Sequence, residues 1–121
     1  MAKVILRKTN LIRRKFRIRK KVVGTSQQPR LSVFRSNKYS YGQIIDDTKG
    51  RTLVGVTLAE IKKAHEETKT KIEAAHVIGK VLAEKAIKGK IKKVVFDRNG
   101  YKFHGRIKEI AEGAREGGLK L

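Results

Sequence analysis

The residues of this chain with the most evident chemical role are its lysines and arginines, which are unevenly distributed. The first 45 residues contain 13 Lys or Arg and no Asp or Glu, whereas residues 46–121 hold 18 basic and 11 acidic residues, a net charge of +7. A segment as one-sided as the first repels itself unless a polyanion neutralises it. Nucleic acid is the best candidate, because its phosphates bind Lys and Arg and release condensed counterions.

The carboxylates offer a second chemistry, metal-dependent RNA cleavage of the RNase H type with Asp46 and Asp97 as metal ligands. Such a nuclease needs several carboxylates that converge on a divalent metal. Asp46 and Asp47 lie in a predicted turn, where Asp is expected to bond to the backbone, and His65 and His76 have no partner at metal-ligand spacing. We therefore expect a binding protein with no catalytic residues, metal, cofactor or small-molecule substrate, and keep the nuclease as the alternative.

Residues 97–106 form a polar and aromatic cluster between a predicted strand and the last predicted helix. This is the carboxyl edge of the strand, where open sheets place binding groups, and Gly105 lies near the helix start, where free amides attract phosphate. Alternatively, Tyr101 and Phe103 close the core while Asp97 pairs with an arginine. The residues predicted to contact RNA here are Arg98, Tyr101, His104 and Arg106.

A second cluster surrounds the turn predicted at residues 36–38. Arg, Asn and Lys in a turn beside exposed tyrosines are suited to holding phosphates and stacking an unpaired base, a contact that structured RNA favours. An ordinary polar hairpin tip is the alternative, and the basic segment directly before it favours RNA. The predicted contacts are Arg35, Ser36, Asn37, Lys38, Tyr39, Tyr41 and Gln43.

Residues 1–28 are predicted to form a basic arm, and Pro29, the only proline, marks the start of a domain spanning 29–121. The arm resembles segments that order against a partner. A solvated tail or a segment lying on anionic lipid are the alternatives, but its apolar residues lack a coherent face. The bases expected to bind RNA are Arg13, Arg14, Lys15, Arg17, Arg19, Lys20 and Lys21.

The composition excludes several other classes of protein. With no cysteine the chain has neither disulfides nor a thiolate metal site. No apolar run approaches the roughly 20 residues that span a bilayer. We expect one α/β domain and an arm, with no membrane partner.

The domain begins with three predicted strands, at 31–34, 39–45 and 51–57. Turn signals at 36–38 and 46–50 separate them, so they form an antiparallel meander. Tyr39, Tyr41, Gln43 and Ile45 are predicted to share one face of the second strand.

Helical spacing follows. Thr57 and Glu60 have the spacing of a capping box, residues 61–69 are either loop or helix, and residues 71–88 form a helix that ends at Gly89. Its buried stripe is predicted as Ile72, Ala75, Ile78, Leu82 and Ala86.

Three consecutive apolar residues, Val94 to Phe96, predict a central strand covered on both faces. The last helix places Ile107, Ile110, Ala111 and Ala114 on one face. A helical connection between the third and fourth strands favours a parallel, right-handed crossover. The fold class is therefore α/β, a mixed sheet of three antiparallel strands and one parallel strand packed with two main helices.

An ordered set of segments along the whole chain resembles the bacterial-type ribosomal protein family numbered eighteen in the large subunit. The matching segments are Gly24-Thr25, Pro29-Arg30-Leu31, Val33-Phe34-Arg35-Ser36-Asn37-Lys38, Gln43-Ile44-Ile45-Asp46-Asp47, Val95-Phe96-Asp97-Arg98, Tyr101, His104-Gly105-Arg106 and Ala114-Arg115-Glu116-Gly117-Gly118-Leu119.

The resemblance implies a non-enzymatic structural protein that binds 5S rRNA and helps to attach it to 23S rRNA in the central protuberance. It also implies an RNase H-like arrangement without nuclease activity, and neighbouring 5S-binding large-subunit proteins as partners. Arg30, in a matching segment, joins the expected RNA-binding residues. The location implied is the cytoplasmic ribosome, or the matrix or stroma of an organelle with bacterial-type ribosomes.

The chain departs from the family pattern at two single residues, and the stretch from Ala59 to Lys69 matches the family poorly. Asn99 stands where the family commonly has Gly, which leaves the geometry of that loop open, and Leu121 replaces a usual terminal Phe.

Overall fold

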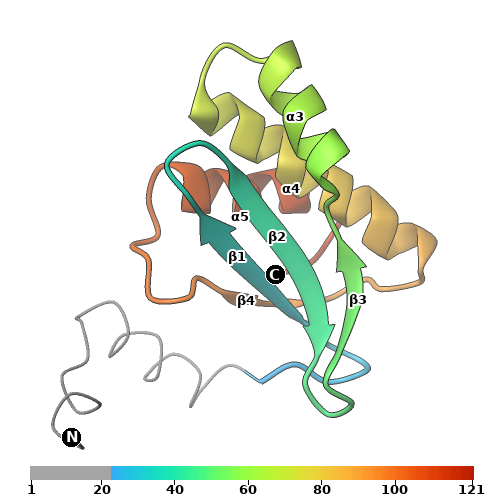
Figure 1. Ribbon diagram of the computed structural model, residues 1–121. Coiled ribbons are helices and arrows are strands. Elements are labelled where there is room, and N and C mark those ends of the chain that lie inside the picture. The colour runs from blue at the N-terminus through green and yellow to red at the C-terminus, as the bar shows by residue number, and fades with distance from the viewer. Residues whose placement is uncertain (1–22) are drawn as a thin grey trace, which may run out of the picture.

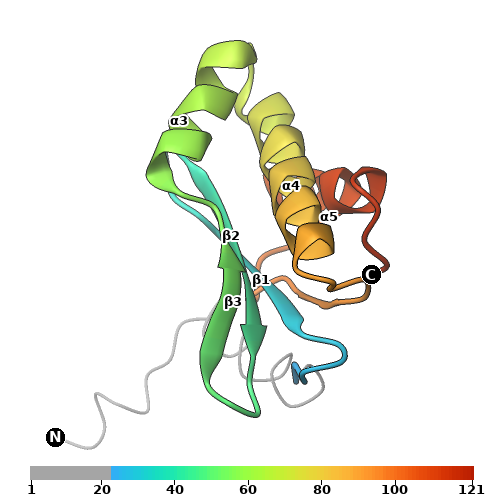
Figure 2. The same ribbon diagram turned by 90° about the vertical axis from the view of Figure 1, so that its right-hand side faces the viewer.

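The computed structural model describes residues 23–121, which form one mixed sheet with helices on one of its faces (Figures 1 and 2). The basic residues between 13 and 21 that were predicted to bind RNA lie outside the described residues. Within them, no helix is long and apolar enough to cross a membrane. The elements in chain order are β1 (Arg30–Arg35), β2 (Ser40–Asp46), β3 (Arg51–Gly55), α3 (Leu58–Glu67), α4 (Lys71–Lys88), β4 (Val95–Asp97) and α5 (Arg106–Glu116).

The sheet has the strand order β3-β2-β1-β4. β1 and β3 each run antiparallel to β2, and β4 runs parallel to β1, with Leu31 opposite Phe96. The predicted mixed sheet is confirmed, and it is compatible with an RNase H-like arrangement. The expectation of a central fourth strand is wrong, because β4 pairs only with β1 in the described sheet.

The apolar residues around β4 are less buried than predicted. Val94 is fully buried, whereas Val95 and Phe96 are only partly buried. The ring of Phe96 meets the ring of Phe103 edge-on, with 5.8 Å between centroids. A short edge strand thus carries consecutive apolar residues because the loop that follows it covers its outer side.

The two faces of the sheet differ sharply. Leu31, Val33 and Ile44 are fully buried on the face that packs against α4 and α5 (Figure 2). The opposite face carries Phe34, half exposed, and Tyr41, partly buried. This alternation follows from the two-residue period of a strand, and none of the helices within residues 23–121 covers the second face.

The helices begin and end close to the predicted positions. Thr57 and Glu60 form the predicted capping box, and the ambiguous segment after it continues as helix α3 to Glu67. α4 has the predicted bounds and ends at Gly89. The buried stripe differs at Ile72, which is 50% exposed, because in the first turn of α4 the small side chain of Ala74 is buried instead.

Two glycines allow α4 and α5 to pack closely. A Cβ on Gly113 of α5 would lie 2.1 Å from the carbonyl oxygen of His76, and one on Gly79 of α4 would lie 2.2 Å from that of Ile110. Backbone therefore meets backbone at this crossing. At the edge of this crossing, Glu116 of α5 forms a hydrogen bond with His76 of α4. This bond is the main cause that raises the pKa of His76.

Arg30 ties together three separate parts of the sheet. Its Nε and Nη2 donate to the Asp47 carboxylate at 2.9 and 3.0 Å, and its Nη1 donates to Asp97 Oδ2 at 2.8 Å. Its side chain is 6% exposed and that of Asp97 is 0% exposed. Burial would lower the pKa of Arg30, but the bonds to both carboxylates outweigh burial and raise it.

The first residues described also attach to this end of the sheet. The amide of Gly24 donates to Asp47 Oδ2 at 2.7 Å, and the amide of Asp47 donates to the Gly24 carbonyl at 3.2 Å. Asp47 therefore joins the segment before β1 to the turn between β2 and β3.

We expect Gly113→Ala to destabilise the domain by about 1–3 kcal/mol, because the added methyl overpacks the helix crossing. Helix propensity alone predicts the opposite sign, a gain of roughly 1 kcal/mol. Urea unfolding measures the difference. Gly55→Ala is the control, since its Cβ would meet nothing within 4 Å. Equal stability of the two variants would contradict close packing at Gly113.

We expect Arg30→Met to lower the free energy of unfolding by about 3–5 kcal/mol, because it removes the cation bonded to the fully buried Asp97 carboxylate. Arg51→Met, at an exposed position of β3, should change it by less than about 0.5 kcal/mol. Thermal or urea unfolding of both variants provides the measurement. A similar small effect of both substitutions would show that Arg30 does not hold the sheet together.

Candidate nucleic-acid interface

The turn between β1 and β2, residues 36–39, is a tight hairpin tip. The amide of Ser36 donates to the Tyr39 carbonyl at 2.8 Å, and the amide of Tyr39 donates to Ser36 Oγ at 3.1 Å. Asn37 and Lys38 at the tip are exposed, and so is Arg35 at the end of β1. The tip therefore presents polar and cationic side chains on a fixed backbone.

Three side chains from other elements hold the backbone of this tip. Arg106, at the start of α5, donates to the Ser36 carbonyl at 2.8 Å, and Lys71, at the start of α4, donates to the Asn37 carbonyl. The Tyr101 hydroxyl donates to the carbonyl of Arg35 at 3.4 Å. Three successive backbone carbonyl oxygens, those of Arg35, Ser36 and Asn37, therefore each accept a hydrogen bond from another part of the protein. Arg106, predicted to contact RNA, has a positioning role at the tip.

The local charge around Arg106 fits this role. Partial burial, followed by the nearby cation of Arg35, lowers the pKa of Arg106. The Arg35 guanidinium itself lies over the Tyr101 ring, 5.1 Å from its centroid. Cation–π contact and the tip backbone thus restrain Arg35 while leaving its side chain exposed.

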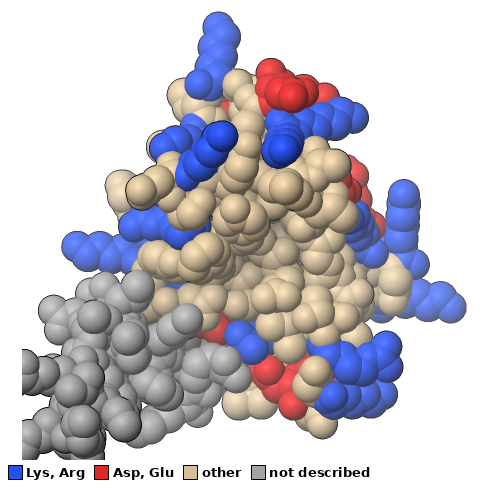
Figure 3. All heavy atoms as spheres, in the orientation of Figure 1, with Lys and Arg blue, Asp and Glu red and all other residues tan. Residues whose placement is uncertain are grey.

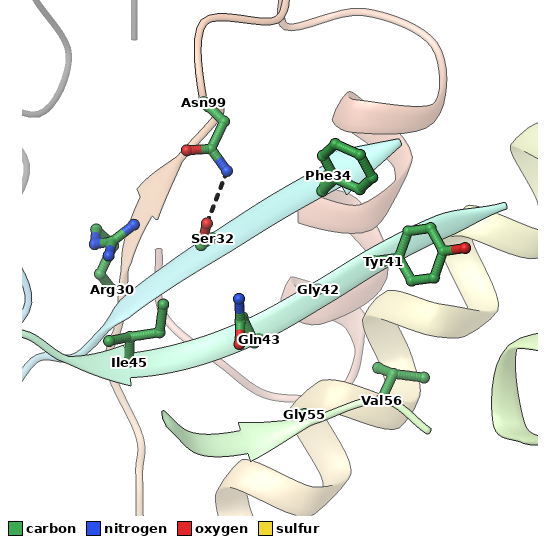
Figure 4. A pocket seen from close by; sticks show the side chains of 10 residues that line it. All are labelled: Arg30, Ser32, Phe34, Tyr41, Gly42, Gln43, Ile45, Gly55, Val56 and Asn99. Atoms are coloured by element: carbon green, nitrogen blue, oxygen red, sulfur yellow. Dashed lines mark hydrogen bonds between the residues drawn. The ribbon is translucent and has the colours of Figure 1, made fainter. Parts of the chain in front are cut away.

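The open face of the sheet contains a hollow of about 540 Å³ (Figure 4). Phe34 and Tyr41 lie side by side above it on neighbouring strands, with ring centroids 5.7 Å apart. Phe34 is 50% exposed. None of the ten residues lining the hollow is acidic; they are Arg30, Ser32, Phe34, Tyr41, Gly42, Gln43, Ile45, Gly55, Val56 and Asn99.

The loop after β4 is anchored to the same face by Asn99. Its side-chain amide donates to Ser32 Oγ at 2.7 Å (Figure 4) and to the Val33 carbonyl at 2.6 Å. The backbone amide of Asn99 donates to Asp97 Oδ1 at 2.9 Å. Asn99 has a φ of 52°, a left-handed conformation that Asn adopts more readily than most residues. The departure from glycine at this position is therefore accommodated.

Cations lie along one edge of this face. Figure 3 shows Lys and Arg along the upper left edge, where the tip and the loop after β4 lie together in Figure 1. The loop adds the cation of Arg98, partly buried, and the exposed imidazole ring of His104. The arrangement combines the rings of Phe34 and Tyr41 on the face with positive charge along this edge.

The structure brings most of the predicted contacts within the described chain onto one surface. Tyr41 and Gln43 line the hollow in the open face, and Tyr101 bonds to the tip at Arg35. The ring of Tyr39 instead packs edge-on against His65 of α3, with 5.0 Å between centroids. Arg30 differs, because Asp47 and Asp97 already take up its donors. We do not include Arg30 among the proposed contacts.

Sequence analysis missed Phe34 and Lys71 as parts of this site. Phe34 alternates with the buried Leu31 and Val33, so the strand period placed it on the open face and was a usable signal. Lys71 gave no such signal, because its carbonyl partner at Asn37 lies 34 residues away in sequence.

The alternative of a metal-dependent nuclease finds no support in the geometry. Residues 23–121 contain no group of three or more His, Asp or Glu side chains that could hold a metal ion. Asp97 is bonded to Arg30, and Asp46 accepts hydrogen bonds from Thr48. The hydrogen bond from the Thr48 hydroxyl is the main cause that lowers the pKa of Asp46.

Known proteins share this sequence along nearly its whole length. The model of the family described as "Ribosomal L18 of archaea, bacteria, mitoch. and chloroplast" matches residues 5–121. The large ribosomal subunit protein uL18 of Pseudothermotoga lettingae is 56% identical over 121 residues, covering 95% of each chain. The uL18 protein of Thermotoga neapolitana is 53% identical over 122 residues and covers all of both chains.

A relative from a different bacterial group agrees. The uL18 protein of Clostridium botulinum strain Langeland is 53% identical over 107 residues, 88% of each chain. A ribosomal protein of bacterial type is located in the cytoplasmic ribosome, with rRNA and other ribosomal proteins as its partners. The chain belongs to the ribosomal L18 family and is a structural, RNA-binding protein of the large ribosomal subunit, not an enzyme.

Proposed function

We propose that this protein binds 5S rRNA and helps to attach it to 23S rRNA in the central protuberance of the large subunit. The observation that carries the proposal is the open face of the sheet, where Phe34 and Tyr41 lie over a hollow without an acidic lining residue. Other 5S-binding proteins of the large subunit are the proposed neighbours.

The rings supply the contact to bases. Phe34 is half exposed and Tyr41 is partly buried, so unpaired bases reach their faces without rearrangement of the core. Stacking of a base on an aromatic ring is worth about 1–3 kcal/mol. Structured RNA offers such bases in loops and bulges, because the A-form major groove is closed to side chains.

The cations beside the open face supply the proposed contacts to phosphate. Arg35 and Lys38 extend from a tip whose carbonyls are held by Lys71 and Arg106, so these cations lose little freedom on binding. Restraint before binding reduces the ordering that association would otherwise require. The proposed contacts within the described chain are Phe34, Arg35, Ser36, Asn37, Lys38, Tyr39, Tyr41, Gln43, Arg98, Tyr101 and His104.

The arm, predicted as residues 1–28, is proposed to reach the adjoining 23S rRNA, and its last residues from Gly24 onward are already attached to the sheet. The support is its sequence, since ten of the 13 basic residues that precede the first acid fall before Pro29. The hydrogen bonds of Gly24 to Asp47 place the start of this connection at the end of the sheet opposite the tip.

We expect the protein to bind 5S rRNA more tightly than an unrelated structured RNA of equal length. Filter binding at several salt concentrations measures both. If the interface makes ~6–10 phosphate contacts, the affinity should fall by roughly 10³–10⁵ between 50 and 200 mM salt, as for duplex DNA. Equal affinity for the two RNAs at physiological salt would contradict specific recognition of 5S rRNA.

We expect Phe34→Ala to weaken binding to 5S rRNA by about 5- to 150-fold, the loss of one stacked base. The slope of affinity against salt should stay unchanged, because no charge is removed. Ile72→Ala is a matched control, since Phe34 and Ile72 are both 50% exposed. If both variants bind like the unaltered protein, the open face is not the site of base stacking.

A further inference from the structure

A second concave surface lies at the other end of the sheet, beside the turn between β2 and β3. It is a hollow of about 370 Å³, and its cationic lining residues are Lys49, Arg51 and Lys90. Figure 3 shows Lys and Arg gathered at the foot of the molecule, next to acidic atoms and over the region where Figure 1 places this turn. Lys49 and Arg51 come from the turn and β3, and Lys90 follows the end of α4.

None of these three cations forms an ion pair within residues 23–121. The hydrogen bond from Thr48 is the main cause that lowers the pKa of Asp46, and the nearby charge of Lys49 also contributes. Asp46 also lines the hollow, but it is 2% exposed and accepts hydrogen bonds from the amide and hydroxyl of Thr48. The surface therefore keeps an excess of positive charge around one buried carboxylate.

The backbone at Lys90 is unusual. In the described chain, the non-glycine residues with positive φ are Asn99 and Lys90, the latter at 66°. The side-chain hydrogen bonds of Asn99 stabilise its conformation, whereas Lys90 makes no side-chain bond there. Glycine is the usual residue just past a helix end, and strained residues cluster at functional sites. Lysine therefore occupies a backbone position that glycine would adopt with less strain.

The positive charge extends well beyond the hollow. Lys93 forms a parallel bridge with Lys120, and the amide of Lys120 donates to the Lys92 carbonyl at 3.0 Å, so the end of the chain adds to the same segment. An extended array of cations fits a chain of phosphates better than a single anion. The exposed bases in this array are Lys49, Arg51, Lys88, Lys90, Lys92, Lys93 and Lys120.

We propose that Lys49, Arg51 and Lys90 form a second phosphate-binding site for RNA, so that the domain holds two RNA segments at once. The proposal rests on the proposed function, in which the open face and tip bind 5S rRNA. The seven residues of β2 separate the two ends, a span of about 20 Å at the rise of a strand. The second segment is a stretch of 23S rRNA backbone.

The test compares the unaltered protein with the triple variant Lys49→Gln, Arg51→Gln, Lys90→Gly. Binding to labelled 5S rRNA alone is measured first, and then the recruitment of full-length 23S rRNA to the preformed 5S complex. We expect the triple variant to bind 5S rRNA within about twofold of the unaltered protein. Its recruitment of 23S rRNA should weaken, and the salt slope of that step should fall by about 3, one per lost phosphate contact.

A second triple variant controls for the loss of charge. Lys62→Gln, Lys69→Gln and Lys108→Gln remove three exposed cations elsewhere on the domain and should leave both steps unchanged. Equal weakening of recruitment in the two triple variants would overturn the proposal, because charge alone would then explain the effect. So would weaker binding of the first triple variant to 5S rRNA itself, which would assign the hollow to that RNA.

Lys90→Gly alone separates function from folding. Removing the strained side chain should raise the melting temperature, since glycine adopts positive φ freely, while recruitment of 23S rRNA still weakens. A raised melting temperature with unchanged recruitment would overturn the site. If these variants bind both RNAs normally but fail to enter large subunits, the hollow binds a protein and the RNA assignment is wrong. Failure of the unaltered protein to prefer 5S rRNA would instead contradict the proposed function.

Discussion

The buried guanidinium of Arg30 is the interaction on which the arrangement of this domain depends. It holds Asp97 of β4 on one side and Asp47 of the β2–β3 turn on the other. β4 is three residues long and pairs with β1 alone in the described sheet, so three ladder positions give it little independent stability. A charge-assisted bond to a fully buried carboxylate supplies the missing constraint.

The same constraint extends to the surface that we propose binds RNA. Asp97 accepts from the amide of Asn99, and the Asn99 side chain bonds to β1 at Ser32 and Val33. The loop that carries Tyr101 therefore starts from a fixed point, and Tyr101 in turn reaches the hairpin tip. Each bond is modest alone, but together they leave the exposed cations on a backbone that needs little ordering when it meets RNA.

Much of the fold followed from local pattern. The meander, the capping box at Thr57, the bounds of α4 and the buried face of α5 were predicted because strand and helix periods depend on neighbours within a few residues. The errors arose where burial depends on remote segments. Three apolar residues predicted a central strand, but the loop after β4 covers the outer side of Phe96. Ile72 fitted the helical stripe, yet it is half exposed.

The sequence by itself determined the polyanion partner, the α/β class and the resemblance to a ribosomal family, since composition, periodicity and ordered motifs need no coordinates. Only the tertiary structure separated the arginines by role. Arg30 and Asp97 are 67 positions apart and Arg106 and Ser36 are 70 apart, and no local pattern links such pairs. An ion pair or a close contact is a property of two surfaces that the fold brings together, so the division between cations that hold the domain and cations that remain exposed was decided there.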